Sequence, residues 1–443
     1  MDICTMKKSF YLALLSSTVL LSACGEKPNP EITLAPISAD VHYLASDELK
    51  GRASFTEYAD NAAEYIAFRF KDVGLKPYKG SYLQSFSIYL RRPISTSVSL
   101  NGQAINLKDV AFVAGKAQLE WQDPSKLNIT VVGADDSLRD AFRVANQQGG
   151  EQLLLVSPAQ AKLFKRYKSY FEYPKAKMSK EDHGSLFAIL TDDIKVNALN
   201  INATSELEEK PLSNVVGILP AKKSNTETVL FSAHYDHLPP KFADDKETIF
   251  NGADDNASGV SGIISLAKHF AALGNNKRDL MFVAFGAEEI GGFGSKYFST
   301  HIDPNNIVAM INLEMIGKPS KFGAGKLWMT GYERSDLAQI MNQSLKSLNT
   351  EIYPDPYPKQ NLFYRSDNAT LARLGVPAHS FSSTQIDKDE HYHQSTDDVS
   401  TLDLKSLTQV VKTVAVASQP LVSGEATPSR IDKQQVKQSG KIF

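Results

Sequence analysis

Five short polar clusters contain most of the side chains that could do chemistry. They combine imidazoles with carboxylates, which are ligands that suit zinc. The clusters are His234–His237, Gly252–Gly259, Ala287–Glu289, Asn312–Met315 and His391–Asp397. Two histidines and three acidic residues are enough to hold two ions that share one bridging carboxylate. The residue types therefore predict a site for two metal ions.

The segments that must position these clusters are short apolar runs, and several clusters directly follow such a run. Runs of this kind are typical of strands that are buried on both faces, and α/β sheets place their sites at the strand ends. The runs are Asn214–Leu219, Val229–Ala233, Leu280–Phe285, Ile307–Leu313, Lys326–Met329 and Ala378–Phe381. We therefore predict an α/β fold with a mainly parallel central sheet flanked by helices.

Each cluster taken alone has a simpler explanation. His234 and Asp236 could form an ordinary hydrogen-bonded pair, and Asp254 with Asp255 could cap the following helix. Glu288 and its neighbour could sit in a solvated first helical turn. A chance origin would need five such coincidences, each at a strand end, so the metal-site interpretation is preferred.

The spacing within these blocks resembles a known enzyme family. The blocks His234-x-Asp236, Gly252–Gly259, Ala287–Glu289 and Tyr392-His393-x-x-x-Asp397 are similar to the signature of the two-zinc aminopeptidases related to glutamate carboxypeptidase and glutaminyl cyclase. The early segment His42–Arg52 also resembles bacterial members. The resemblance spans residues 37–100 and 212–422. It implies a three-layer zinc-dependent exopeptidase fold.

The resemblance also implies a ligand set. One zinc ion would be held by His234, Asp254 and Glu314, and the second by Asp254, Glu289 and His393, so that Asp254 bridges the two ions. The family pattern further implies a cis peptide bond between Asp254 and Asp255. Glu314 departs from the pattern because the family usually has aspartate there, although glutamate remains a competent oxygen ligand.

Three further residues receive roles from the same resemblance. Glu288 would be the general base, because its side chain leaves the backbone in a different direction from that of Glu289 and can face the water. Asp236 would accept the second N–H of the His234 imidazole and fix its tautomer. Tyr364, before the Ser366–Asn368 block, would help to stabilise the oxyanion.

The expected activity is that of an aminopeptidase, which hydrolyses N-terminal residues from peptides with two Zn²⁺ ions per chain. Three alternatives remain open. The same fold hosts glutaminyl cyclases and carboxypeptidases, and it also occurs in catalytically inactive surface proteins that only bind. The near balance of 48 Lys and Arg against 50 Asp and Glu argues against a nucleic-acid partner.

The N-terminus predicts export and lipid attachment. Lys7 and Lys8 precede the apolar run Phe10–Leu21, which is short for a membrane span. The following Leu21–Cys24 resembles the lipobox of bacterial lipoproteins. We therefore expect residues 1–23 to be a signal peptide and Cys24 to be lipid-modified. Periplasmic location is then expected, and the Gly-Glu pair after Cys24 favours the outer over the inner membrane.

The remaining chain divides by composition. Residues 24–36 are polar and contain three prolines, which predicts a flexible tether. Residues 37–105 and 211–422 would form the zinc peptidase domain, and residues 106–210 would form an inserted α+β lid, similar to a protease-associated domain. Residues 423–443 are polar and are expected to be a flexible tail. Oligomeric state is left open.

Overall fold

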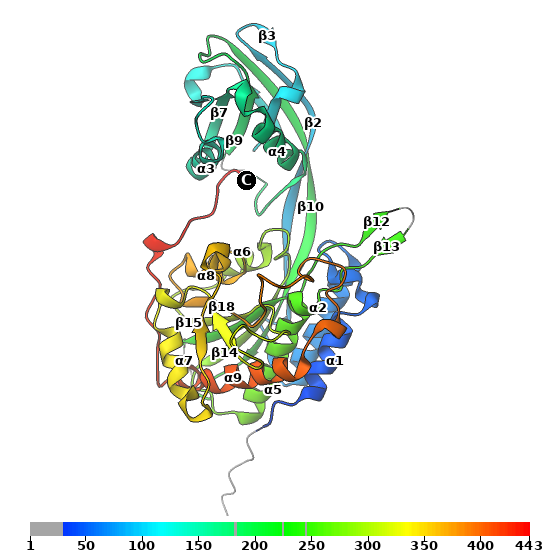
Figure 1. The fold of residues 1–443 in the computed structure, drawn as a ribbon, viewed down its shortest axis with the longest axis vertical. Helices are drawn as coiled ribbons and strands as arrows, with labels where there is room; N and C mark the ends of the chain where they lie inside the picture. Colours follow the sequence, from blue (N-terminus) through cyan, green and yellow to red (C-terminus); the bar gives the residue numbers. More distant parts are fainter. Residues whose placement is uncertain (1–29, 181–183, 224–225, 244–245) are drawn as a thin grey trace, which may run out of the picture.

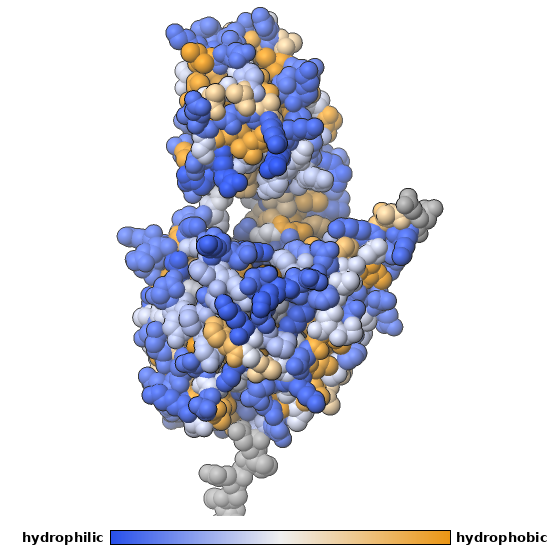
Figure 2. All heavy atoms as spheres, in the orientation of Figure 1, coloured by the Kyte–Doolittle hydropathy of each residue, from blue (hydrophilic) through white to orange (hydrophobic). Residues whose placement is uncertain are grey.

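The computed structural model describes residues 30–180, 184–223, 226–243 and 246–443. These residues form a main domain and a smaller domain, which lie one above the other along the long axis of the molecule (Figure 1). Two long strands connect them. Figure 2 shows a largely hydrophilic face on both domains, with a hollow between them on this side.

The main sheet has four parallel strands at its centre. They are β18 (Ala378–Ser382), β15 (Ile307–Leu313), β11 (Thr228–His234) and β14 (Asp279–Phe285), in that spatial order. Every residue of β11 and β15 is buried, as expected for strands with both faces covered. The predicted α/β sheet is confirmed.

The flanks of this sheet make it mixed rather than mainly parallel. On one side β14 pairs antiparallel with β10 (Leu199–Leu219), which in turn pairs antiparallel with β2 (Leu83–Leu100). On the other side β18 pairs antiparallel with β16 (Leu327–Met329), which is followed by β17 (Ile352–Pro354). The prediction underestimated the antiparallel part, because buried apolar runs do not reveal the direction in which a strand runs.

Helices cover both faces of the sheet. One face packs against α1 (Leu34–Leu44), α2 (Glu57–Asp72), α5 (Gly259–Leu273), α7 (Leu337–Leu345) and α9 (Leu404–Ala417) in one large apolar core. The other face packs against α6 (Phe293–Ser299) and α8 (Asn368–Ala372) in a second core. The predicted three-layer arrangement is therefore present. None of the described helices is long and apolar enough to cross a bilayer.

The smaller domain is connected to the main sheet by two strands that extend into it. β2 pairs with β10 from Leu199 to Val215, and the outer halves of both strands belong to the smaller domain. Between them lie a four-stranded sheet and two helices with a core of their own. These elements are β4 (Val110–Val113), β6 (Asn128–Val132), β7 (Gly150–Val156), β9 (Gly184–Leu190), α3 (Leu138–Gln148) and α4 (Ala161–Glu172).

Both terminal segments differ from the expectation of flexible chain. Cys24 lies outside the described residues, but the later part of the predicted tether is packed: Ile32 is buried and the carbonyl of Pro30 accepts a hydrogen bond from His269 at 2.8 Å. The predicted flexible tail is also ordered. Val436 packs in the core beside α8, and Ile442 is buried in the core of the smaller domain. The tail thus runs from one domain to the other (Figure 1), because apolar residues spaced along it find buried positions.

Candidate metal centre

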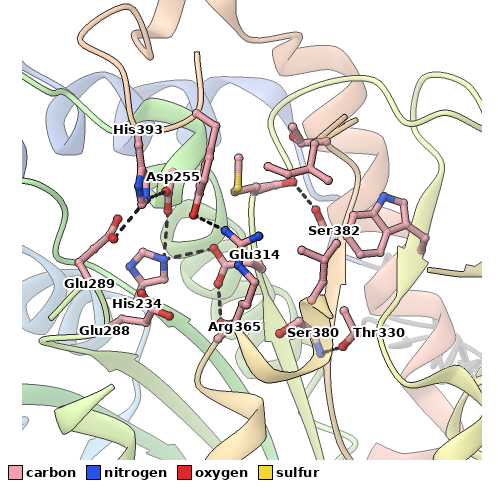
Figure 3. A pocket seen from close by; sticks show the side chains of 17 residues that line it. His234, Asp255, Glu288, Glu289, Glu314, Thr330, Arg365, Ser380, Ser382 and His393 are labelled. Atoms are coloured by element: carbon pink, nitrogen blue, oxygen red, sulfur yellow. Dashed lines mark hydrogen bonds and ion pairs between the residues drawn. The ribbon is translucent and has the colours of Figure 1, made fainter. Parts of the chain in front are cut away.

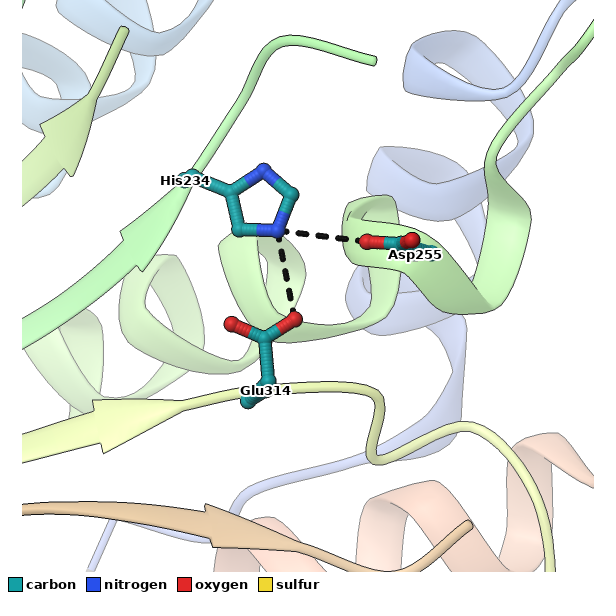
Figure 4. Close-up of side chains that lie close together, drawn as sticks. All are labelled: His234, Asp255 and Glu314. Carbon is teal, nitrogen blue, oxygen red and sulfur yellow. Dashed lines mark hydrogen bonds and ion pairs between the residues drawn. The ribbon is translucent and has the colours of Figure 1, made fainter. Parts of the chain in front are cut away.

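The first group of possible metal ligands lies at the end of β11. His234 Nε2 is 3.2 Å from Oδ1 of Asp255 and 3.2 Å from Oε1 of Glu314 (Figure 4). His234 Nδ1 is 3.1 Å from the backbone carbonyl of Asp236, which orients the ring so that Nε2 faces the two carboxylates. One imidazole and two carboxylates therefore converge on one point.

The second group uses the other oxygen of the same aspartate. His393 Nε2 is 3.2 Å from Oδ2 of Asp255 and 3.2 Å from Oε2 of Glu289 (Figure 3). His237 Nδ1 lies 2.8 Å from Oε1 of Glu289 and 3.8 Å from Oδ2 of Asp255, so it is geometrically a candidate ligand as well. His393 lines the pocket and His237 does not, so we assign His393 to the ligand position and His237 to the support of Glu289.

The shared carboxylate is that of Asp255, whereas the sequence led to Asp254. Asp254 faces away from both groups. Its Oδ1 accepts a hydrogen bond from the backbone N–H of Gly317 at 2.8 Å, and its Oδ2 accepts one from the hydroxyl of Thr384 at 2.5 Å. The Asp254 carboxylate is completely buried and already has these partners, so it is a structural group of the loop.

The backbone of this loop explains the one-residue difference. Gly252 adopts φ of +58°, and a Cβ there would lie 2.3 Å from the carbonyl oxygen of Asp255. The cis peptide bond joins Asp255 to Asn256, not Asp254 to Asp255 as the resemblance implied. The Asp397 carboxylate accepts the N–H groups of Asp254 and Asp255 at 3.1 Å, which fixes the turn. The direction of each aspartate is thus set by the backbone.

Asp236 positions the segment after β14 rather than the His234 ring. Its carboxylate is 3.9 Å from His234 Nδ1, too far for the predicted hydrogen bond. Instead it accepts the backbone N–H of Glu288 at 2.9 Å and, more weakly, that of Glu289 at 3.4 Å. Ala287, directly before, has φ of +60°, a conformation that residues with a side chain rarely adopt. The Asp236 carboxylate helps to hold this strained turn, which directs Glu288 and Glu289 towards the site.

Arg52 positions the loops of the site. From the sequence it was noted only as the last residue of the segment His42–Arg52. Its side chain is fully buried and donates to the backbone carbonyls of Tyr235 at 2.7 Å, Asn251 at 2.7 Å and Gly252 at 3.0 Å. A further short hydrogen bond goes to the carbonyl of Leu44. One guanidinium therefore ties together the two loops that carry the first histidine and the shared aspartate.

Glu288 lines the pocket beside these groups. Its burial raises the pKa of the carboxyl well above the usual range; His234 opposes this, and the neighbouring Asp367 and Glu314 add to it. Burial also disfavours the charged form of His234, but the carboxylates of Glu314 and Glu288 outweigh it and raise the pKa of the imidazole well above its ordinary value. The carboxyl groups and the His234 imidazole therefore shift one another's pKa values.

Tyr364 does not line the pocket of the two ligand groups. Its hydroxyl accepts the backbone N–H of Lys437 in the C-terminal segment at 3.2 Å, and its side chain lines an adjoining cavity together with Glu288 and Arg365, so the oxyanion role stays a prediction. Tyr392 and Arg365 lie in the pocket instead, and Arg365 Nη2 donates to the Tyr392 hydroxyl at 3.0 Å. Sequence reasoning missed this pair, although Tyr392 stands next to His393 in a motif that it singled out.

The donor set fits zinc. Imidazole nitrogens and carboxylate oxygens are common zinc ligands, and the two groups share Asp255 through its two different oxygens. Asp255, Glu288, Glu289 and Glu314 bring four carboxylates together, and divalent cations would replace the protons that they and the imidazoles otherwise share. The Ser366 hydroxyl donates to Oε2 of Glu314 at 2.6 Å, so glutamate is supported at this position.

The chain is similar in sequence to known peptidases. Residues 214–418 match the model of peptidase family M28. Aminopeptidase YwaD of Bacillus subtilis is 25% identical over 279 residues, which cover 61% of this chain and 56% of that protein. A vacuolar membrane protease of Yarrowia lipolytica is 33% identical over 112 residues, which cover 25% of this chain and 10% of that protein. The chain therefore spans only about half of the aminopeptidase and a tenth of the protease.

Two solved structures share the fold. The zinc aminopeptidase BSAP from Bacillus subtilis has a TM-score of 0.53 at 18% identity, and the match covers 94% of this chain and 99% of that one. An aminopeptidase from Aneurinibacillus sp. strain AM-1 has a TM-score of 0.53 at 15% identity, with 92% and 97% covered.

Proposed function

We propose that this chain is a zinc-dependent exopeptidase, and specifically an aminopeptidase; the match of residues 214–418 to the model of peptidase family M28 supports this. The observation that carries the proposal is the Asp255 carboxylate. Its Oδ1 faces His234 and Glu314, and its Oδ2 faces His393 and Glu289. A carboxylate that offers one oxygen to each of two ligand groups is suited to bridge a pair of ions.

In this proposal His234, Asp255 and Glu314 hold one ion, and Asp255, Glu289 and His393 hold the other. When bound, two zinc ions supply Lewis acidity that lowers the pKa of water and polarises a peptide carbonyl. His237 lies close by. Its Nδ1 donates a hydrogen bond to Oε1 of Glu289 at 2.8 Å and so keeps that ligand in place.

Glu288 would move the protons. Its half-buried carboxylate lines the pocket and makes no direct hydrogen bond with other described side chains, so it is available to take a proton from water. It would then give that proton to the amine that leaves when the peptide bond breaks. A carboxyl whose pKa is raised is a stronger base than an ordinary carboxylate, which suits the first of these two steps.

Tyr392 and Arg365 would stabilise the oxygen of the attacked carbonyl. Burial raises the pKa of the Tyr392 phenol, so its hydroxyl keeps its proton and can donate it. Arg365 donates to the same hydroxyl oxygen and thereby makes the phenol a stronger hydrogen-bond donor. The many carboxylates around the pocket are complementary to the free α-ammonium group of a peptide, which favours an aminopeptidase.

The test uses the chain from residue 25 onward, with leucyl-4-nitroanilide and N-acetyl-leucyl-4-nitroanilide as substrates and metal analysis of the same sample. The proposal expects cleavage of the free amine only, about two zinc ions per chain, and loss of activity on chelation. Pyroglutamate formation from glutaminyl peptides, or bound zinc without any cleavage, would instead favour the cyclase or the binding role.

We also propose that Cys24 carries a lipid that anchors the chain to a membrane facing the periplasm, on the strength of the Leu21–Cys24 sequence. Expression in a Gram-negative host with labelled palmitate tests this. The full chain should take up label and sediment with membranes, and the Cys24→Ser variant should do neither. Equal labelling of both would contradict it.

A further inference from the structure

A second hollow adjoins the pocket of the candidate metal centre. It encloses about 300 Å³ and shares Glu288, Arg365 and Ser366 with that pocket. Its far wall includes Lys296 of α6, Arg373 directly after α8 and Ser439 of the C-terminal segment. We call these six residues the cationic hollow. Because the two cavities share Glu288, a substrate that is cleaved there can extend from one cavity into the other.

The charge of the far wall is positive and only partly balanced. The Lys296 ammonium packs over the ring of Phe293 at 5.0 Å and forms no ion pair or side-chain hydrogen bond with the part of the chain that the structure describes. Arg373 donates through Nε to the backbone carbonyl of Lys437 at 2.9 Å, so the tail holds this guanidinium beside the hollow. The anionic neighbours are Glu288 at the border and Asp367, which is almost completely buried below.

The titration of Lys296 agrees with this geometry. Its partial burial lowers the pKa of the ammonium, and the nearby Arg373 and Lys177 lower it further, while Asp367 opposes them. Cations that destabilise one another in a half-buried cavity would be stabilised by a bound anion. A carboxylate is the anion that a peptide supplies.

The two cavities differ in the part of a substrate that each can accept. The pocket at the metal centre has an apolar wall of Trp328, Leu362 and Ile386, which suits the side chain of the residue before the scissile bond. The residue after that bond must then lie beyond Glu288. In a dipeptide its carboxylate carbon is only about 2.5 Å from the scissile nitrogen, which is short enough to bring it into the cationic hollow.

We propose that the cationic hollow binds a carboxylate on the leaving side of the scissile bond, so that the chain prefers dipeptides or peptides with an acidic residue after the scissile bond. This inference rests on the proposed peptidase function and specifies its substrate class. The shared chemistry is a carboxylate close to the scissile nitrogen. It can come from the free C-terminus of a dipeptide or from an acidic side chain.

The test compares kcat/KM for matched substrates. Leu-Ala against Leu-Ala-amide reports on the α-carboxylate, and Leu-Glu-amide against Leu-Gln-amide reports on the side chain. In at least one pair we expect the carboxylate form to be favoured about ten- to a hundredfold, as for one or two charged hydrogen bonds. The pair that shows the preference identifies the source of the carboxylate.

The variants Lys296→Gln and Arg373→Gln should bring that ratio towards one, whereas Lys268→Gln, at an exposed position of α5, should leave it unchanged. Equal rates within both pairs for the unmodified chain would overturn the inference, and so would variants that slow both members of a pair equally. Failure of the proposed function is distinguishable, because leucyl-4-nitroanilide would then not be cleaved at all.

Discussion

Two carboxylate clusters meet at the peptide bond between Asp254 and Asp255, and they have opposite surroundings. The cluster around Asp255 contains imidazoles and borders an open pocket. The cluster around Asp254 is closed: Lys318 Nζ lies 3.8 Å from Asp254, 2.8 Å from Asp389 and 3.6 Å from Asp397. In the closed cluster one ammonium and backbone N–H groups stabilise the acids.

The difference shows what separates a functional acid from a structural one. Asp254 and Asp255 are both buried and adjacent in sequence, so neither burial nor residue type distinguishes them. The partners do. The acid with fixed hydrogen bonds from Thr384 and Gly317 holds the loop, whereas the acid that faces only titratable groups is free to accept a cation.

The largest expected effect is on the open cluster. Glu288→Gln keeps the shape of the side chain but removes the base, so kcat should fall by at least about a thousandfold. Zinc content should stay the same, because Glu288 is not a proposed ligand. Glu333→Gln, whose side chain is 75% exposed, is the control. Substantial residual turnover would show that another group takes the proton.

A change in the closed cluster should lower the stability of the folded chain. Lys318→Met leaves the carboxylates of Asp254, Asp389 and Asp397 buried without their cation, and breaking a buried pair in this way costs about 3–5 kcal/mol of unfolding free energy. Urea denaturation measures the loss, with Lys321→Met as the matched control because Lys321 is exposed. An unchanged midpoint for the first variant would mean that the ammonium is not needed there.

The next effect concerns the oxyanion. Tyr392→Phe keeps the ring, which stacks on His393 at 3.9 Å, and removes only the hydroxyl. Loss of one such donor should lower kcat by about a hundredfold with little change in KM. Tyr173→Phe is the matched control, because that side chain is 73% exposed on the smaller domain. If both variants lose the same activity, the assignment to Tyr392 is wrong.

The smallest effect extends the comparison to the histidines. His379 on β18 is buried without an adjacent carboxylate partner: its Nδ1 lies 2.8 Å from the carbonyl of Thr330 and its Nε2 lies 2.8 Å from the Ser335 hydroxyl. Burial lowers the pKa of His379 to about 4. Burial acts in the same direction on His393, but its two carboxylate partners outweigh it and raise the pKa of that imidazole to about 10.

The sign of the pH effect follows from the His379 pKa. In the unfolded chain the imidazole takes up a proton near its ordinary pKa of 6.5, and in the folded chain only near 4, so stability falls as the pH drops through this window. At pH 5 His379 should lower the free energy of unfolding by about 2 kcal/mol relative to about pH 7.5. Urea unfolding at both pH values should show this extra loss in the unmodified chain and not in His379→Gln; equal losses would contradict it.

Most of the fold and most of the site could be predicted from the sequence. The buried strand runs and the polar residues after them were recognisable because periodicity and residue type reflect burial directly. His234, Glu289, Glu314 and His393 do converge in the structure, as expected. The parts that could not be predicted depend on backbone direction and on distant contacts.

Two examples show that limit in physical terms. Asp254 and Asp255 are chemically identical, and the choice between them depends on the turn that Gly252 and the Asp397 carboxylate fix from outside the pair. The tail looks polar, yet Ile442 is buried because α3 and α4 present an apolar surface to it. Local composition cannot report a partner that lies hundreds of residues away in the chain.

The most direct test of the central claim is the zinc content of Asp255→Asn and Asp254→Asn, measured by native mass spectrometry beside the unmodified chain. We predict about two zinc ions for the unmodified chain and for Asp254→Asn, and loss of at least one ion together with the peptidase activity for Asp255→Asn. Loss of zinc from Asp254→Asn with retention by Asp255→Asn would contradict the account.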